Sequence, residues 1–226
     1  MACFICSVFL FSCYGVTKIT LIRGLCIMGR VRSIFGSIAK LFLLQTGTKL
    51  AKHSGIISSG AGRDDCKCIQ TNIGGSMIEQ FFDQTSSSFT YLVFSSKHNA
   101  CIIDPVKENN EIYIEYIAKH QLNLNFILET HTHADHVTGS GLLIDMFGCK
   151  TFCGMASNNT NIETLHDGQQ IFLDDLNIQA MYTPGHTDDS YSYLLKSPES
   201  TYLFSGDTLL INGCGRTDFQ NGDPEQ

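Results

Sequence analysis

The hydrophobic pattern from residue 77 onward predicts a series of short strands with few helices. Short apolar runs bounded by turn residues predict strands at 89–94, 100–104, 125–129, 171–173, 177–182, 191–195 and 201–204. Apolar residues at helical spacing predict helices over 108–120 and 139–147. In the second half the strands follow one another with few helices between them, which argues against a doubly wound parallel sheet. The expected fold class is α/β.

The pattern before residue 77 is different. Residues 2–16 are nearly all apolar, but they are shorter than the roughly 20 residues that span a bilayer, so no stable membrane span is expected. From Met28 a basic amphipathic stretch follows, and residues 58–76 are rich in Gly and Ser, which is typical of a linker. We therefore expect a basic leader and linker at 1–76 and a folded domain at 77–226.

Charge divides the chain at the same place. The chain of 226 residues has a net charge of −7, which argues against a nucleic-acid partner bound through phosphate contacts. Eight of its 15 basic residues and none of its 22 acidic residues lie in 1–63. A basic, acid-free, amphipathic segment is typical of a mitochondrial presequence. A membrane-surface helix, or an upstream extension with Met77 as the true start, are the alternatives.

The chemistry of the sequence gathers at strand ends. A cluster of three histidines and one aspartate, H-x-H-x-D-H, directly follows the strand at 125–129 and contains His131, His133, Asp135 and His136. A loop leaving a strand can direct alternate side chains toward one point, as a metal ion requires. His186 follows a strand in Thr-Pro-Gly-His-Thr, and Asp207 follows another in Phe-Ser-Gly-Asp. Three such features together predict a metal site.

This combination resembles the metallo-β-lactamase superfamily over about residues 77–226. Within the superfamily the sequence is most similar to the persulfide dioxygenases, the family of the ethylmalonic encephalopathy protein. Four stretches carry the resemblance: FFDQTSSSFTYLV (81–93), IIDPV (102–106), THTHADHVTGSGLL (130–143) and SGDTLLINGCGRTDFQ (205–220). Glyoxalase II enzymes share a GDTL…GCG element, but the run GCGRTDFQ looks like the dioxygenase version. The resemblance implies a metallo-β-lactamase-like αββα sandwich, which we expect to be incomplete at the C-terminus.

Carried over by motif position, the resemblance implies the facial triad of non-haem Fe(II) oxygenases, with one Fe(II) per chain held by His131, His186 and Asp207. The remaining residues of the H-x-H-x-D-H cluster would orient ligands and waters by hydrogen bonds. In the zinc hydrolases of the superfamily these residues would help to bind two metal ions, so zinc is the alternative metal. The implied reaction is the oxidation of glutathione persulfide by O₂ and water to sulfite and glutathione, a step of sulfide catabolism.

Arg216 lies in the GCGRTDF run and is the only Arg after residue 63. Its guanidinium suits bidentate recognition of a glutathione carboxylate. A structural ion pair with Asp218 or a bond to a loop carbonyl is an equally good interpretation. The sequence leaves the oligomeric state open, a homodimer included.

Two departures from the family pattern affect the interpretation. The family usually has Gly two residues past Thr187, where this chain has Asp189 after Asp188. We expect this added negative charge near the substrate entrance to weaken glutathione binding. A P-A-H-D-Y-like segment of the family has no match here; its His binds the second metal of the hydrolases but is not an iron ligand in the dioxygenases, which favours one iron. A zinc thiolesterase of glyoxalase II type and an inactive metal-binding fragment stay open as alternatives.

The leader generates a prediction about location. If residues 28–60 are a presequence, a fusion of residues 1–76 to a reporter should enter the mitochondrial matrix and be clipped, because this acid-free segment carries five basic residues between Met28 and Lys52. Cell fractionation and the mobility of the reporter on a gel measure both events. A reporter that stays uncut in the cytosol, or is secreted, contradicts the presequence and favours a cytoplasmic protein that starts at Met77.

Overall fold

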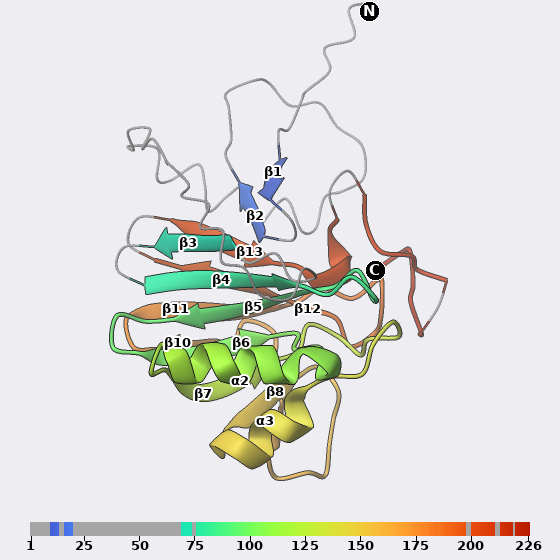
Figure 1. The fold of residues 1–226 in the computed structure, drawn as a ribbon. Coiled ribbons are helices and arrows are strands. Elements are labelled where there is room, and N and C mark those ends of the chain that lie inside the picture. The colour runs from blue at the N-terminus through green and yellow to red at the C-terminus, as the bar shows by residue number, and fades with distance from the viewer. Residues whose placement is uncertain are drawn as a thin grey trace, which may run out of the picture.

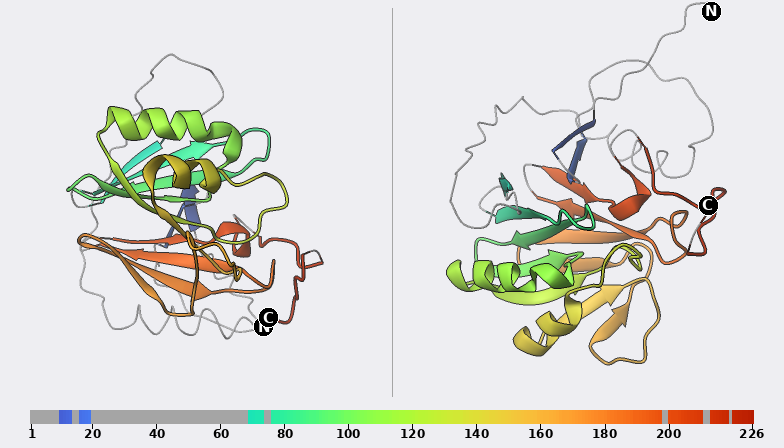
Figure 2. Two further views of the ribbon diagram at one scale, coloured as in Figure 1. Left: turned by 90° about the horizontal axis from the view of Figure 1, so that it is seen from below. Right: turned by 45° about the vertical axis from the view of Figure 1, so that its right-hand side comes forward.

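In the described part of the chain, a mixed sheet and an antiparallel sheet face each other, and two α-helices cover the outer face of the mixed sheet (Figures 1 and 2). The computed structural model describes residues 10–13, 16–19, 69–73, 76–197, 200–210, 213–218 and 220–226. The expected presequence at 28–60 lies outside the described residues. Within the described part, no helix is long and apolar enough to cross a membrane.

The first sheet has seven strands in the order β3-β4-β5-β6-β7-β8-β9. Their bounds are β3 Ile69–Ile73, β4 Ser76–Phe82, β5 Phe89–Phe94, β6 Asn99–Ile103, β7 Asn123–Leu128, β8 Lys150–Cys153 and β9 Ile162–Thr164. Neighbours from β3 to β6 pair antiparallel, and neighbours from β6 to β9 pair parallel.

Parallel strands need long crossover connections, and helices supply two of them here. The 3₁₀ helix η1 (Lys107–Asn109) and helix α2 (Asn110–Lys119) connect β6 to β7. Helix α3 (Ser140–Phe147) lies between β7 and β8, and ends at Gly148 in the left-handed conformation with φ 65°. Both helices pack on the same face of the first sheet (Figure 2).

The second sheet has six strands in the order β1-β2-β13-β12-β11-β10, all paired antiparallel. Their bounds are β1 Leu10–Cys13, β2 Val16–Ile19, β10 Gln170–Leu173, β11 Leu176–Tyr182, β12 Tyr191–Lys196 and β13 Thr201–Phe204. The 3₁₀ helix η2 (Gly206–Thr208) follows β13. Strand β2 of the hairpin β1-β2 pairs with β13, so part of the expected leader belongs to this sheet.

Two apolar layers hold the elements together. The layer between the sheets includes Val93, Ile103, Ile178 and Tyr193, all fully buried. The layer between the first sheet and the helices includes Tyr113 of α2 and other apolar side chains of α2, α3 and the sheet. Each sheet strand therefore alternates its side chains between the core and the other face, as in β11, where buried and partly exposed positions alternate.

The α/β class and the two-sheet architecture expected from the sequence are confirmed, as are the helices and the strands that the pattern predicted. Four strands of the first sheet were missed. β4 contains Glu79 and Gln80, which are buried and polar, so its pattern did not look like a strand. Residues 69–73, which lie inside the expected linker at 58–76, form β3 on the edge of the sheet. Among the described residues, no α-helix covers the outer face of the second sheet.

The layer between the sheets generates a stability prediction. Ile178→Ala removes a fully buried side chain from this layer and should lower the free energy of unfolding by about 2–5 kcal/mol. Phe172→Ala, on the neighbouring strand and 65% exposed, is the matched control and should change it by about 0.5 kcal/mol or less. Urea denaturation measures both. Equal effects of the two substitutions would mean that this layer is not the core.

Candidate metal centre

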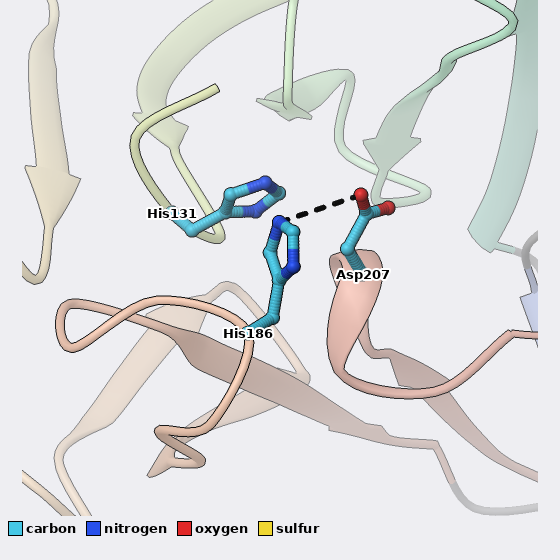
Figure 3. A group of neighbouring side chains, drawn as sticks. All are labelled: His131, His186 and Asp207. Atoms are coloured by element: carbon cyan, nitrogen blue, oxygen red, sulfur yellow. Dashed lines mark ion pairs between the residues drawn. The ribbon is translucent and has the colours of Figure 1, made fainter. Parts of the chain in front are cut away.

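Three loops that leave the ends of strands meet at one edge of the sandwich. β7 of the first sheet is followed by His131, and β11 and β13 of the second sheet are followed by His186 and Asp207. β11 and β13 both pair antiparallel with β12, so they run in the same direction and end at the same edge. Figure 3 shows the three side chains pointing toward one another from these loops. The structure thus brings together the three residues that the resemblance implied as metal ligands.

The distances within this group fit a single metal ion. One ligand atom from each residue lies within 4.8 Å of the other two. Nε2 of His186 is 3.6 Å from Oδ2 of Asp207, and the rings of His131 and His186 meet edge-on with their centroids 4.9 Å apart. Two ligand atoms at right angles around one ion lie about 3 Å apart, given bonds of about 2.1 Å. Two imidazoles and one carboxylate are also a donor set that suits zinc or iron.

The three side chains differ in exposure. His131 is buried, whereas the side chain of His186 is 10% exposed and that of Asp207 is 51% exposed. Burial, reinforced by the neighbouring His133, lowers the pKa of His131 to about 4. The His131 ring is therefore neutral near neutral pH, which is the form that binds a metal. The group is therefore open to solvent on the side of Asp207.

Hydrogen bonds fix the orientation of both imidazole rings. Nδ1 of His186 lies 2.7 Å from the backbone carbonyl oxygen of Arg216, which can only accept, so Nδ1 carries the proton. Nδ1 of His131 lies 2.9 Å from the hydroxyl of Thr130. That hydroxyl donates its own proton to Asp104, so it accepts from His131. Both rings consequently leave Nε2 without a proton and available to a metal ion.

The carboxylate of Asp104 anchors the loop after β7. Asp104 is buried directly after β6 and accepts hydrogen bonds from the backbone N–H of Thr130 (2.7 Å) and from the Thr130 hydroxyl (2.9 Å). Its backbone has φ 51°, in the left-handed region that few residues other than Gly adopt. Burial opposes the charge of Asp104, but His133, His131 and the Thr130 hydrogen bond together outweigh burial and lower the pKa of the carboxyl group.

Two glycines allow the loops to approach the histidines closely. A Cβ atom at Gly206 would lie 2.4 Å from the Thr130 hydroxyl oxygen, and Gly206 also has φ 47°. A Cβ atom at Gly215 would lie 2.7 Å from Nδ1 of His186. A larger residue would displace the Thr130 hydroxyl at the first position and the His186 ring at the second. These glycines therefore position the second sheet's loops against the candidate ligands.

The other residues of the H-x-H-x-D-H cluster form a second group beside the first. Ligand atoms of His133, Asp135 and His136 lie within 4.8 Å of one another. Asp135 accepts a hydrogen bond from the Ser88 hydroxyl (2.6 Å), and its other oxygen lies 3.0 Å from Nδ1 of His136. The structure thus places all three residues at the centre, as the sequence predicted, without testing the roles proposed for them.

His133 is turned toward two buried carboxylates. Its Nε2 lies 3.2 Å from Oδ1 of Asp104 and 3.7 Å from Oε2 of Glu129, contacts that are ionic rather than well-directed hydrogen bonds. Burial alone would lower the pKa of His133, but the charge of Asp104 raises it to about 9. Burial, and then the charge of Asp104, raises the pKa of Glu129 to about 7. Without a bound metal, His133 is therefore protonated near neutral pH.

Arg216 contributes through its backbone as well as its side chain. Its guanidinium makes a bidentate pair with Asp218, with Nε and Nη2 at 2.8 and 3.0 Å from the two carboxylate oxygens. Both side chains are exposed, at 64% and 72%. This is the ion pair that the sequence offered as an alternative to a substrate contact. The contact between the Arg216 carbonyl and His186 was not predicted.

The loop after His186 carries the two aspartates that depart from the family pattern. Asp188 is exposed, whereas the carboxylate of Asp189 accepts hydrogen bonds from Thr132 and Thr187. Burial raises the pKa of Asp189, but these hydrogen bonds outweigh it and hold the pKa below its usual value, so the group is ionised. Both aspartates line a cleft of about 210 Å³, together with Thr132, Met155, Thr187, Gln220 and Asn221.

Sequence reasoning missed the groups that position the candidate ligands. Asp104 was recognised as the end of a strand and Thr130 as part of a motif, but neither was assigned a role. Their signal was present, because each directly follows one of two consecutive parallel strands, whose ends meet at the same edge. The Arg216 carbonyl leaves no such signal, since every residue carries a backbone carbonyl.

Comparison with known proteins places this arrangement in a family. The family model described as the metallo-beta-lactamase superfamily matches residues 84–226. The chain is 33% identical over 189 residues to "Persulfide dioxygenase ETHE1, mitochondrial" of Bos taurus, covering 83% of this chain and 66% of the relative. It is 33% identical over 147 residues to the "Probable hydroxyacylglutathione hydrolase glo2" of Schizosaccharomyces pombe, covering 63% of this chain and 56% of that protein.

A solved structure gives the same result. The crystal structure of ETHE1 from Myxococcus xanthus superposes with a TM-score of 0.59 and 38% sequence identity, covering 65% of this chain and 64% of that one. The chain therefore spans between 56% and 66% of the length of these three proteins. The two-sheet sandwich, the group of candidate ligands at its edge and the matched family model agree, and the chain belongs to the metallo-β-lactamase superfamily.

Proposed function

We propose that the chain is a persulfide dioxygenase, which oxidises glutathione persulfide with O₂ and water to sulfite and glutathione. In this reaction the outer sulfur of the persulfide is oxidised, O₂ is reduced, and the sulfur–sulfur bond breaks to release glutathione. The relatives from Bos taurus and Myxococcus xanthus, named as persulfide dioxygenase and ETHE1, support this assignment. The GCGRTDFQ run at 213–220 supports it as well.

The group of His131, His186 and Asp207 is the observation that carries the proposal. These residues would hold one Fe(II) ion, because they are the donors of a 2-His-1-carboxylate triad and their ligand atoms lie within 4.8 Å of one another. When bound, iron supplies the one-electron steps by which O₂ reacts with a spin-paired substrate. Three ligands leave coordination positions open to small molecules, and the exposure of Asp207 gives access to them.

Other residues of the chain set the protonation of the two imidazoles and orient the groups around them. The Thr130 hydroxyl and the Arg216 carbonyl keep the proton on Nδ1 of each imidazole, so that both rings present Nε2. His133, Asp135 and His136 orient waters and ligands beside the triad. The half-exposed carboxylate of Asp135, held by Ser88, lies where it can accept hydrogen bonds from such a water.

A zinc-dependent thiolester hydrolase of glyoxalase II type is the second candidate. The observation in its favour is the second group of possible ligands, His133, Asp135 and His136, beside the first. The similarity to the hydroxyacylglutathione hydrolase of Schizosaccharomyces pombe also supports it. Nε2 of His133 faces the carboxylates of Asp104 and Glu129, so Nδ1 is the atom of His133 that would bind a second metal ion. We further propose a mitochondrial location, supported by the acid-free leader and by the name of the bovine relative, which includes the word mitochondrial.

The metal content distinguishes the two candidates. The purified chain should carry about one iron per chain and consume O₂ when glutathione persulfide is added. His131→Ala and Asp207→Ala should each abolish iron binding, because each removes one of only three ligands. Metal analysis and an oxygen electrode measure these properties. Two zinc ions per chain together with thiolester cleavage would reject the iron enzyme in favour of the hydrolase.

Arg216 is proposed to bind a carboxylate of glutathione. Arg216→Lys should raise KM for glutathione persulfide by about tenfold, because Lys cannot form two parallel hydrogen bonds, and should affect kcat less. Iron content should not change, since the contact with His186 comes from the backbone carbonyl. Steady-state kinetics with metal analysis provide the measurement.

Asp218→Asn is the matched control for Arg216, because it weakens the ion pair and keeps the guanidinium. It should leave KM within a factor of about two, because the guanidinium that would bind the substrate is still present. The loss of an exposed ion pair should also matter little for stability. If both variants lose iron and melt at a lower temperature, Arg216 is a structural brace. If KM of Arg216→Lys stays unchanged in a folded, iron-loaded protein, the contact with substrate is rejected.

A further inference from the structure

One carboxylate joins the two loops that carry the candidate histidine ligands. Oδ2 of Asp189 accepts hydrogen bonds from the Thr132 backbone N–H (3.1 Å) and from the Thr132 hydroxyl (2.6 Å). Oδ1 of Asp189 accepts one from the Thr187 hydroxyl (2.6 Å). Thr132 directly follows His131 and Thr187 directly follows His186. A single side chain is therefore bonded to the residue after each histidine, although the two loops come from different sheets.

The backbone around Asp189 is held in place by other contacts. The backbone N–H of Tyr191 donates to the carbonyl of Thr130 (2.7 Å), which ties the end of this loop to the loop after β7. A Cβ atom at Gly154 would lie 2.1 Å from the carbonyl oxygen of Asp189, so this loop packs directly on the end of β8. The backbone of Asp189 is thus held between the loops by contacts that do not involve its side chain. The side chain is therefore not needed to order this loop.

We propose that Asp189 is a positioning residue for the metal centre, which sets the separation of His131 and His186 through Thr132 and Thr187. A charged acceptor is suited to this role, because hydrogen bonds to a carboxylate are stronger than those between neutral groups. Groups that orient metal ligands typically change metal affinity by about 10- to 100-fold when they are removed. This inference rests on the metal-binding part of the proposed function and not on its persulfide chemistry.

The affinity of the full-length chain for Co(II) tests the inference. Asp189→Ala should weaken Co(II) binding by about 10- to 100-fold, measured by competition with a chelator. It should also alter the visible absorption spectrum of the bound Co(II), which reports the arrangement of the ligands. Asp189→Asn should restore part of the affinity, because its amide can still accept from Thr132 and donate to the Thr187 hydroxyl.

Asp188→Ala is the matched control. Asp188 carries the same charge at the adjacent position, but its carboxylate bonds to Asn221 (3.2 Å) and to neither threonine. The control should bind Co(II) within a factor of about two of the wild type with an unchanged spectrum. Thermal melting of each variant in the presence of EDTA measures the stability of the metal-free fold.

Several outcomes would overturn the inference. Equal loss of affinity in Asp189→Ala and Asp188→Ala would mean that only the net charge matters. An unchanged Co(II) affinity and spectrum in Asp189→Ala, with or without a lower melting temperature, would leave Asp189 at most a structural residue. A wild-type chain that binds Co(II) no better than a His131→Ala/Asp207→Ala variant would also reject it. A wild type that binds Co(II) but consumes no O₂ with persulfide rejects only the proposed function.

Discussion

The buried carboxylate of Asp104 and its hydrogen bonds to Thr130 are the contact on which the arrangement of the site depends. An ionised group in the interior is stable only when nearby donors compensate for the lost water. Here the compensating donors are the backbone N–H and hydroxyl of Thr130, with the imidazole of His133 on the other side. The residue that satisfies the charge is the one that holds Nδ1 of His131, so the stability of the strand ends and the orientation of a ligand depend on the same atoms.

The two-sheet architecture explains why the remaining candidate ligands lie at this point. β6 and β7 are parallel neighbours, so Asp104 and His131 come from the same edge of the first sheet. β11 and β13 deliver His186 and Asp207 from the second sheet. The apolar layer between the sheets fixes the distance between the two edges. The candidate ligands come from both sides of this layer. The geometry of the group therefore depends on how the sheets pack as well as on the local loops.

Many of the strands and the candidate ligands could be predicted from the sequence alone. Strands β10 to β13 of the second sheet were predictable because they are short apolar runs bounded by turn residues, and the candidate ligands were predictable because each follows a strand. β4 was not predictable in this way, because Glu79 is buried and its carboxylate is satisfied by the hydroxyl of Tyr116 in α2, 37 residues later. The Asp189 contacts were not predictable either, since they join residues whose proximity depends on both sheets.

The contact between His186 and residue 216 makes the orientation of the His186 ring independent of the side chain at residue 216. The ring is held by a backbone carbonyl, which is present whatever side chain occupies the position. Mutation at residue 216 can therefore alter which molecules the exposed rim accepts while the nearby imidazole keeps its orientation. During divergence within the superfamily, such a position can drift toward new specificities without passing through variants that have lost the metal centre. A library randomised at this codon would vary the exposed rim while the backbone contact that orients His186 stays in place.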